Sequence, residues 1–178
     1  VTAASAQAQL WFDRGLIWTY GYSHEEAIEC FRRALAADPD CAMAWWGLAY
    51  ALGPNYNMPW AKMDAAMRAA RLGEAHAATA RALALAHRVA EPERALIEAL
   101  PARYPQAEPL EDMRPWDAAF AEAMRGAYTA LPDDLEVATV FVEAIMNVTP
   151  WRMWDLATGE PAPRSGAREA QAVLERAF

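Results

Sequence analysis

The sequence predicts an all-α fold, and three observations lead to this prediction. Alanine, leucine, arginine, glutamate and methionine, which are strong helix formers, dominate the chain. Valine, isoleucine and threonine are sparse, and no stretch alternates apolar and polar residues over the length of a strand. Aromatic and small residues also recur at fixed spacings between Trp11 and Pro39, as expected for helices that cross closely.

The bulk composition limits the classes of function that we expect. Of the 178 residues, 55% are apolar, which suffices for one compact domain or several stacked helical repeats and disfavours disorder. The net charge is −8 at pH 7, and Lys62 is the only lysine. Because an acidic surface repels phosphate backbones, no nucleic-acid partner is expected. No apolar run approaches the ~20 residues of a membrane span, so no membrane partner is expected either.

Three helices are predicted before residue 53. The first is expected over residues 4–20, where apolar residues share one broad face and Gly21 follows. The second is expected to begin with the capping box "SHEE" at Ser23 and to end near residue 37, because Pro39 follows. The third is expected over residues 40–52, before the turn-rich stretch "GPNYNMP".

Further helices are predicted along the rest of the chain. The pattern is helical over 60–87, with a division near Gly73, and Pro92 fits the first position of a helix that ends near Tyr104. Pro115 is expected to open a helix that reaches Leu131, and the "PDD" that follows caps another to about residue 147. After a long loop, "TPWRMWDLATGEPAPR", a last helix is expected from about residue 165.

One internal repeat organises the first part of the chain. Seven positions have spacings of 4, 3, 9, 4, 3 and 5, namely Trp11, Gly15, Trp18, Ala27, Phe31, Ala34 and Pro39. This pattern resembles the tetratricopeptide repeat (TPR), and Trp45 begins a second unit 34 residues after Trp11. A weaker echo covers 115–146, with Phe120, Met124, Ala127 and Pro132 in place.

The resemblance implies a TPR-like α-solenoid, a right-handed superhelical stack of antiparallel helix pairs. We divide the chain into three parts. Residues 1–53 hold one full TPR-like unit and the first helix of the next, and residues 54–114 hold degenerate helical repeats with loops. Residues 115–178 hold further TPR-like helices and a Trp-rich loop. An unrelated α-helical bundle is the alternative.

A finer resemblance concerns the order of several short stretches. "FDRGL", "ERALIEALPARY" and "PWRMW" look like the N-terminal part of a group of larger bacterial TPR proteins that carry a histidine-rich segment further along. The helical pattern also stops abruptly at the end of the sequence. This resemblance implies a longer parent protein, and a metal is expected only in that parent.

The resemblance also implies a concave groove lined by the first helix of each repeat. The repeat positions that contact ligands in this family correspond here to Gln9, Phe12, Leu16, Thr19, Tyr20, Met43, Trp46, Tyr50 and Gly53. From these we select five binding residues, namely Phe12, Leu16, Tyr20, Trp46 and Tyr50. These helix faces are aromatic and almost uncharged, so they do not suit a ligand's carboxylate. An apolar helix, a Pro-rich segment or downstream helices of the same protein suit them better.

Two loops carry the other candidate binding residues. Asn55, Asn57 and Trp60 lie in the first loop, and Trp151, Arg152 and Trp154 lie in the second. In repeat proteins such insertions often lie on the binding face. The alternative interpretation is that these side chains pack against the fold and fix two long loops.

No catalytic constellation is visible in the sequence. His24, His76 and His87 are read as helix-end or surface residues, and Cys30 and Cys41 as buried thiols. No cofactor is evident, and the metal-binding and phosphate-binding motifs are absent. A cytoplasmic location is expected, with a periplasmic or secreted one left open because the chain begins with Val1.

The sequence thus leads to two hypotheses of different class. The first is a protein-interaction scaffold of TPR type, which binds a protein or peptide segment or its own later helices and which could form oligomers. The second is the N-terminal helical portion of a larger metal- or small-molecule-binding enzyme, whose chemical residues lie outside this chain.

Overall fold

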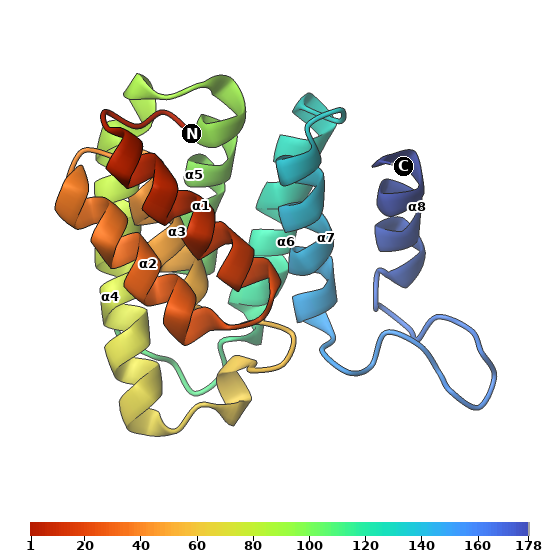
Figure 1. The fold of residues 1–178 in the computed structure, drawn as a ribbon. Helices are drawn as coiled ribbons and strands as arrows, with labels where there is room; N and C mark the ends of the chain where they lie inside the picture. The colour runs from red at the N-terminus through yellow and green to blue at the C-terminus, as the bar shows by residue number, and fades with distance from the viewer. Residues whose placement is uncertain (178) are drawn as a thin grey trace.

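The computed structural model describes residues 1–177 and confirms the all-α fold (Figure 1). Within these residues eight α-helices and two short 3-10 turns form, and no strand is present. The helices are α1 (Ala6–Tyr20), α2 (His24–Ala37), α3 (Ala42–Leu52), α4 (Ala65–Leu85), α5 (Glu91–Arg103), α6 (Arg114–Ala130), α7 (Leu135–Val148) and α8 (Ala167–Ala177), with the 3-10 turns at Trp60–Lys62 and Ala86–Arg88.

The ends of the helices depend on caps that the sequence only partly indicated. α1 begins two residues later than expected because the Ser5 hydroxyl accepts a 3.1 Å hydrogen bond from the Ala8 amide. Ser23 does precede α2, but its side chain makes no capping hydrogen bond, so the predicted capping box does not form. Asp134 caps α7 as the "PDD" stretch predicted, through the Val137 amide at 2.9 Å.

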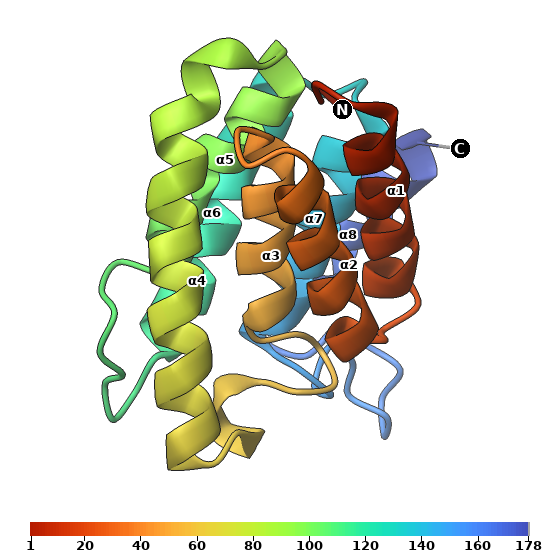
Figure 2. The same cartoon turned by 60° about the vertical axis from the view of Figure 1, so that its left-hand side comes forward.

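Two expected features of the middle helices are wrong. The division near Gly73 is absent, because α4 continues through this residue after the Asp64 side chain caps it (Figure 2). A glycine inside a helix costs only ~1 kcal/mol, which the surrounding packing outweighs. In α5, Glu91 takes the first position and Pro92 the second.

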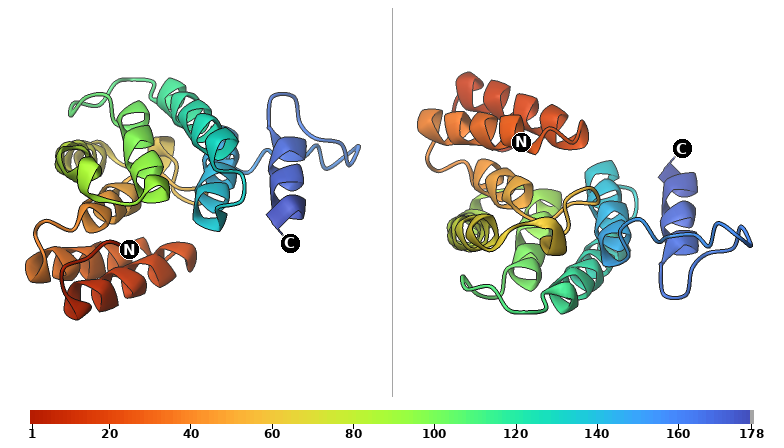
Figure 3. Two further views of the ribbon diagram at one scale, coloured as in Figure 1. Left: turned by 90° about the horizontal axis from the view of Figure 1, so that it is seen from above. Right: turned by 90° about the horizontal axis from the view of Figure 1, so that it is seen from below.

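Each helix packs against the next along the chain, and α1, α3, α5 and α7 also contact one another in that order. Figure 3 shows the helices following an arc, with α1 and α2 at one end and α8 at the other. Within residues 1–177, no helix is both long and apolar enough to cross a bilayer.

Two glycines allow three helices to meet around one ring. Phe31 of α2 is fully buried and lies between Gly15 of α1 and Gly47 of α3. A Cβ atom at either glycine would lie within 3.0 Å of the Phe31 ring. Glycine at these two positions therefore sets how closely α1 and α3 approach α2.

Candidate functional site

The five residues predicted to line a groove divide between two cavities. Phe12, Leu16 and Trp46 line a cavity of about 410 Å³, here called the Phe12 cavity. Tyr20 and Tyr50 line a smaller one of about 270 Å³, here called the Tyr20 cavity. The rings of Trp46 and Tyr50 stack with centroids 4.9 Å apart, so one aromatic pair contributes a ring to each cavity.

The Phe12 cavity has an apolar floor and an acidic rim. Its floor is made by Phe12, Leu16, Met43, Trp46 and Leu96, from α1, α3 and α5, and its rim carries Asp13, Glu93, Asp134 and Glu136. One positive group also lines it, the N-terminal ammonium of Val1, which lies 3.9 Å from Glu93. The predicted face contributes almost no charge of its own. The acidic rim was missed because three of its carboxylates come from α5 or the start of α7, far away in the sequence.

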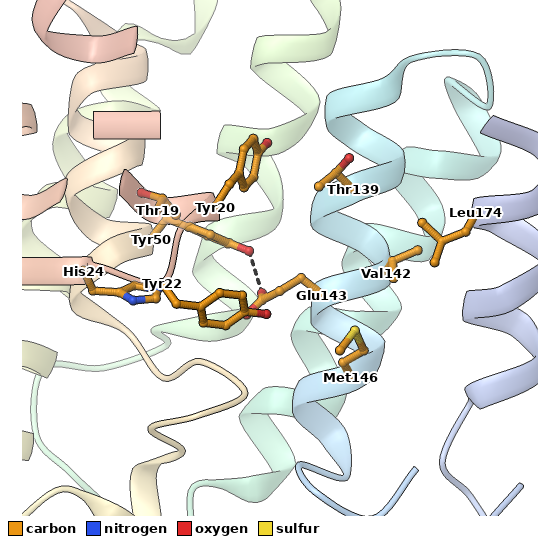
Figure 4. Close-up of a pocket in the computed structure, with 10 residues that line it drawn as sticks. All are labelled: Thr19, Tyr20, Tyr22, His24, Tyr50, Thr139, Val142, Glu143, Met146 and Leu174. Atoms are coloured by element: carbon orange, nitrogen blue, oxygen red, sulfur yellow. Dashed lines mark hydrogen bonds between the residues drawn. The ribbon is translucent and has the colours of Figure 1, made fainter. Parts of the chain in front are cut away.

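The Tyr20 cavity lies where the end of α1 and the start of α2 face α7 (Figure 4). Tyr22 and His24, which were not among the predicted binding residues, also line the cavity on this side, and α8 contributes Leu174. The full lining is Thr19, Tyr20, Tyr22, His24, Tyr50, Thr139, Val142, Glu143, Met146 and Leu174. Tyr20 and Tyr22 are 41% and 44% exposed, so both of these lining residues also reach the protein surface.

The turn after α1 places Tyr22 in an unusual backbone conformation. The Ser23 amide bonds to the Trp18 carbonyl at 2.9 Å and the Tyr22 amide to the Thr19 carbonyl at 3.1 Å, which is the Schellman pattern. Glycine usually takes the left-handed position of this motif, but here Tyr22 does, with φ 59°, while Gly21 has φ −79°. Such a conformation costs roughly 1–2 kcal/mol for a residue with a side chain.

Hydrogen bonds within the protein already engage most hydroxyl groups of the Tyr20 cavity. Tyr50 donates to Glu143 at 2.5 Å, and Tyr20 donates to Glu136. Thr19 donates to the Gly15 carbonyl and Thr139 to the Leu135 carbonyl, each within its own helix. The lining therefore presents aromatic and carboxylate groups to a ligand, and few free donors.

Burial and the nearby carboxylates shift several pKa values in this cavity. The pKa of Tyr50 is raised well above its ordinary value by burial and then by Glu143, and that of Tyr20 is raised by burial and its bond to Glu136. Burial lowers the pKa of His24, which keeps its imidazole neutral at pH 7. Both phenols are likewise neutral at pH 7.

A charged cluster lies in the core behind the Tyr20 cavity. Arg103 is only 1% exposed, and its guanidinium lies 4.7 Å from the ring centroids of both Tyr50 and Phe120 and donates to the Pro54 carbonyl. Burial raises the pKa of Asp117, on α6, to about 7, although the charge of Arg103 opposes this shift. Asp117 lines neither of the two cavities.

The two candidate loops meet, but their residues form no single site. Asn55 and Trp60 are buried, and the Asn55 side chain accepts hydrogen bonds at 3.0 Å from the amides of Asn57 and Met58. Trp151 is 60% exposed and stacks on Tyr56 with centroids 5.5 Å apart. Asn57 and Arg152 are exposed as well, and Trp154 lies in a separate cavity beside α8.

Among residues 1–177, His, Cys, Asp and Glu side chains form no group of three that could hold a metal ion. His76 bonds to the Tyr104 carbonyl at 2.8 Å, and Cys30 and Cys41 are buried and unpaired. Comparison with known protein families, curated proteins and solved structures finds no match to this chain.

Proposed function

We propose that this chain is a protein-interaction scaffold of TPR type, and that the Phe12 cavity is the centre of its concave groove. The observation that carries the proposal is the apolar floor of this cavity beneath a rim where four carboxylates outnumber one ammonium, that of Val1. The helices α1, α3, α5 and α7, which contact one another along the arc, all contribute to it. That order of contacts is the one expected if these are the first helices of successive repeats.

The chemistry of the cavity selects the kind of segment that it binds. Apolar side chains fill the floor, and lysine or arginine side chains pair with the rim, so the bound segment is apolar with basic residues beside the anchors. A segment rich in Asp or Glu is rejected, because its charges would face Asp13 and Glu136 without partners.

The predicted residues are not equally useful for testing this proposal. Phe12 and Trp46 are 2% exposed and Tyr50 is 5% exposed, so alanine at any of them would open a hole in the core. Asp13 is exposed and lines the cavity, which makes Asp13→Arg the better variant. Glu26→Arg is the matched control, because Glu26 is exposed and lies outside both cavities.

The test uses two synthetic amphipathic peptides, one of leucine and lysine and the other of leucine and glutamate. We expect the lysine peptide to bind in a fluorescence anisotropy titration and Asp13→Arg to weaken it about tenfold, while Glu26→Arg leaves it within twofold. Equal binding of both peptides would refute the proposal. So would equal weakening by the two substitutions, which indicates attraction by net charge alone.

A further inference from the structure

We propose that the Tyr20 cavity binds an alkylated ammonium group, as in a quaternary ammonium compound. This inference does not depend on the groove binding a protein segment, because the Phe12 cavity and the Tyr20 cavity share no lining residue. It follows from the size of the cavity, its partly exposed aromatic rings, its charge and its apolar wall.

The size limits the ligand to a small head group. At about 270 Å³ the cavity is below the ~300–1,000 Å³ typical of sites for drug-sized molecules. Figure 4 shows the side chains of Tyr20, Tyr50 and Tyr22 on one side of the cavity and Glu143 and Met146 of α7 on the other. Tyr20 and Tyr22 are partly exposed, and aromatic rings that line a cavity attract a cation through their negative faces.

The charge inside the cavity favours a cation. Glu143 accepts hydrogen bonds from Tyr50 and, at 2.7 Å, from Asn147, but it makes no ion pair with a basic side chain among the described residues. Glu136, which bonds to the phenol of Tyr20, lines the Phe12 cavity and not this one. His24, whose pKa burial lowers, adds no positive charge at pH 7. A cation would therefore meet one carboxylate of the lining, Glu143, and no basic side chain within the lining. The Arg103 guanidinium lies outside the lining, 4.7 Å from the centroid of the Tyr50 ring.

The wall distinguishes an alkylated ammonium from a bare one. Val142, Met146 and Leu174 are apolar and suit methyl groups. A bare ammonium carries three N–H donors that require acceptors, whereas a quaternary ammonium requires none. An anionic or carbonyl ligand is disfavoured, because the hydroxyls of Thr19, Tyr20, Tyr50 and Thr139 already donate within the protein.

The backbone at Tyr22 gives this inference an unusual test. The left-handed conformation of Tyr22 is one that glycine adopts without strain, so Tyr22→Gly removes the ring and relieves the backbone at once. We expect this variant to keep or raise the melting temperature of the protein while losing the ligand. A residue retained only for stability would behave in the opposite way.

The experiment titrates the chain with tetramethylammonium chloride at pH 7.5 and constant ionic strength, with sodium chloride as the blank, and follows the tyrosine signals by NMR. We expect saturable shifts and about tenfold weaker binding in Tyr22→Gly and in Glu143→Gln. Tyr22→Phe, which keeps the ring, should bind within twofold of the unchanged protein. Trp18→Ala, an exposed aromatic of α1 outside the cavity, should do the same.

Two results would overturn the inference. One is the absence of saturable shifts in the unchanged protein, and the other is unchanged binding in a folded Tyr22→Gly variant. If the site is present, choline and a peptide containing trimethyllysine identify the source of the head group. Peptide binding at least tenfold tighter than choline indicates a side chain of a protein, and equal binding indicates a free small molecule.

Discussion

Asp117 is a buried carboxyl group whose titration connects a single residue to the stability of the fold. Burial raises its pKa from 3.8 to about 7, so the folded chain holds this proton more tightly than the unfolded chain. The contribution of Asp117 to the free energy of unfolding is therefore most favourable below pH 3.8 and is lost as the pH rises from there to about 7. At ~1.4 kcal/mol per pH unit, the loss amounts to roughly 4 kcal/mol.

Asp117→Asn removes this titration and keeps the shape of the side chain. We compare the free energy of unfolding of this variant with that of the unchanged protein, by urea denaturation at pH 5 and at pH 8. The difference in favour of the variant should be about 2 kcal/mol larger at pH 8. Asp112→Asn is the control: Asp112 is paired with Arg114 and has a pKa lowered to about 2, so its effect should be the same at both pH values. If Asp117→Asn changes the free energy of unfolding equally at pH 5 and pH 8, the pKa of Asp117 is not raised in the folded chain.

The contact between Phe31 and the two glycines beside it predicts how a substitution would affect the packing of α1, α2 and α3. Gly47→Ala would place a methyl group against the Phe31 ring, which cannot move away because Gly15 bounds its other side. We expect this substitution to destabilise the fold by about 1–3 kcal/mol despite the better helix propensity of alanine. Thermal and urea unfolding of the variant measure this cost.

Two further variants separate packing from propensity. Gly73→Ala lies inside α4 with nothing within 4 Å of the added Cβ, so it should stabilise the chain by roughly 0.5–1 kcal/mol. In a Phe31→Leu background, Gly47→Ala should cost less than it does alone, since the smaller side chain leaves room for the methyl group. Equal effects of Gly47→Ala and Gly73→Ala would show that the contact with Phe31 is not limiting.

The helices themselves could be predicted from local patterns, whereas their ends could not be predicted reliably. Periodicity and the proline punctuation identified each long helix, because both act within a few residues. The capping box at Ser23 failed because a capping bond depends on the turn that precedes the helix. That turn is a Schellman motif with Tyr22, not glycine, in the left-handed position.

Only part of the lining of the two candidate cavities could be predicted from the sequence. The spacing of the repeat selected Phe12, Tyr20, Trp46 and Tyr50 on α1 and α3, and these residues do line cavities. Their acidic partners on α7 lie more than 80 residues later, at Glu136 and Glu143. No local pattern links two such segments, so this part of the site depends on the packing of the whole molecule.

The two Trp-rich loops offer a prediction at the same scale, because they join the first half of the chain to the last. Trp151, which follows α7, stacks on Tyr56, and the Lys62 ammonium lies 4.9 Å from the centroid of the same indole. A partly exposed stack and cation–π contact are together worth about 1 kcal/mol. Trp151→Ala should therefore raise the population of the opened loop about fivefold.

Limited proteolysis with trypsin measures this opening, because Lys62 and Arg152 place a cleavage site in each loop. When opening is fast relative to cleavage, the cleavage rate follows the open population, so both sites should be cut about fivefold faster in Trp151→Ala. Trp154→Ala is the control, since Trp154 lies in a cavity beside α8 and should leave cleavage after Lys62 unchanged. Faster cleavage after Arg152 alone would mean that the loops move independently and that Trp151 fixes only its own segment.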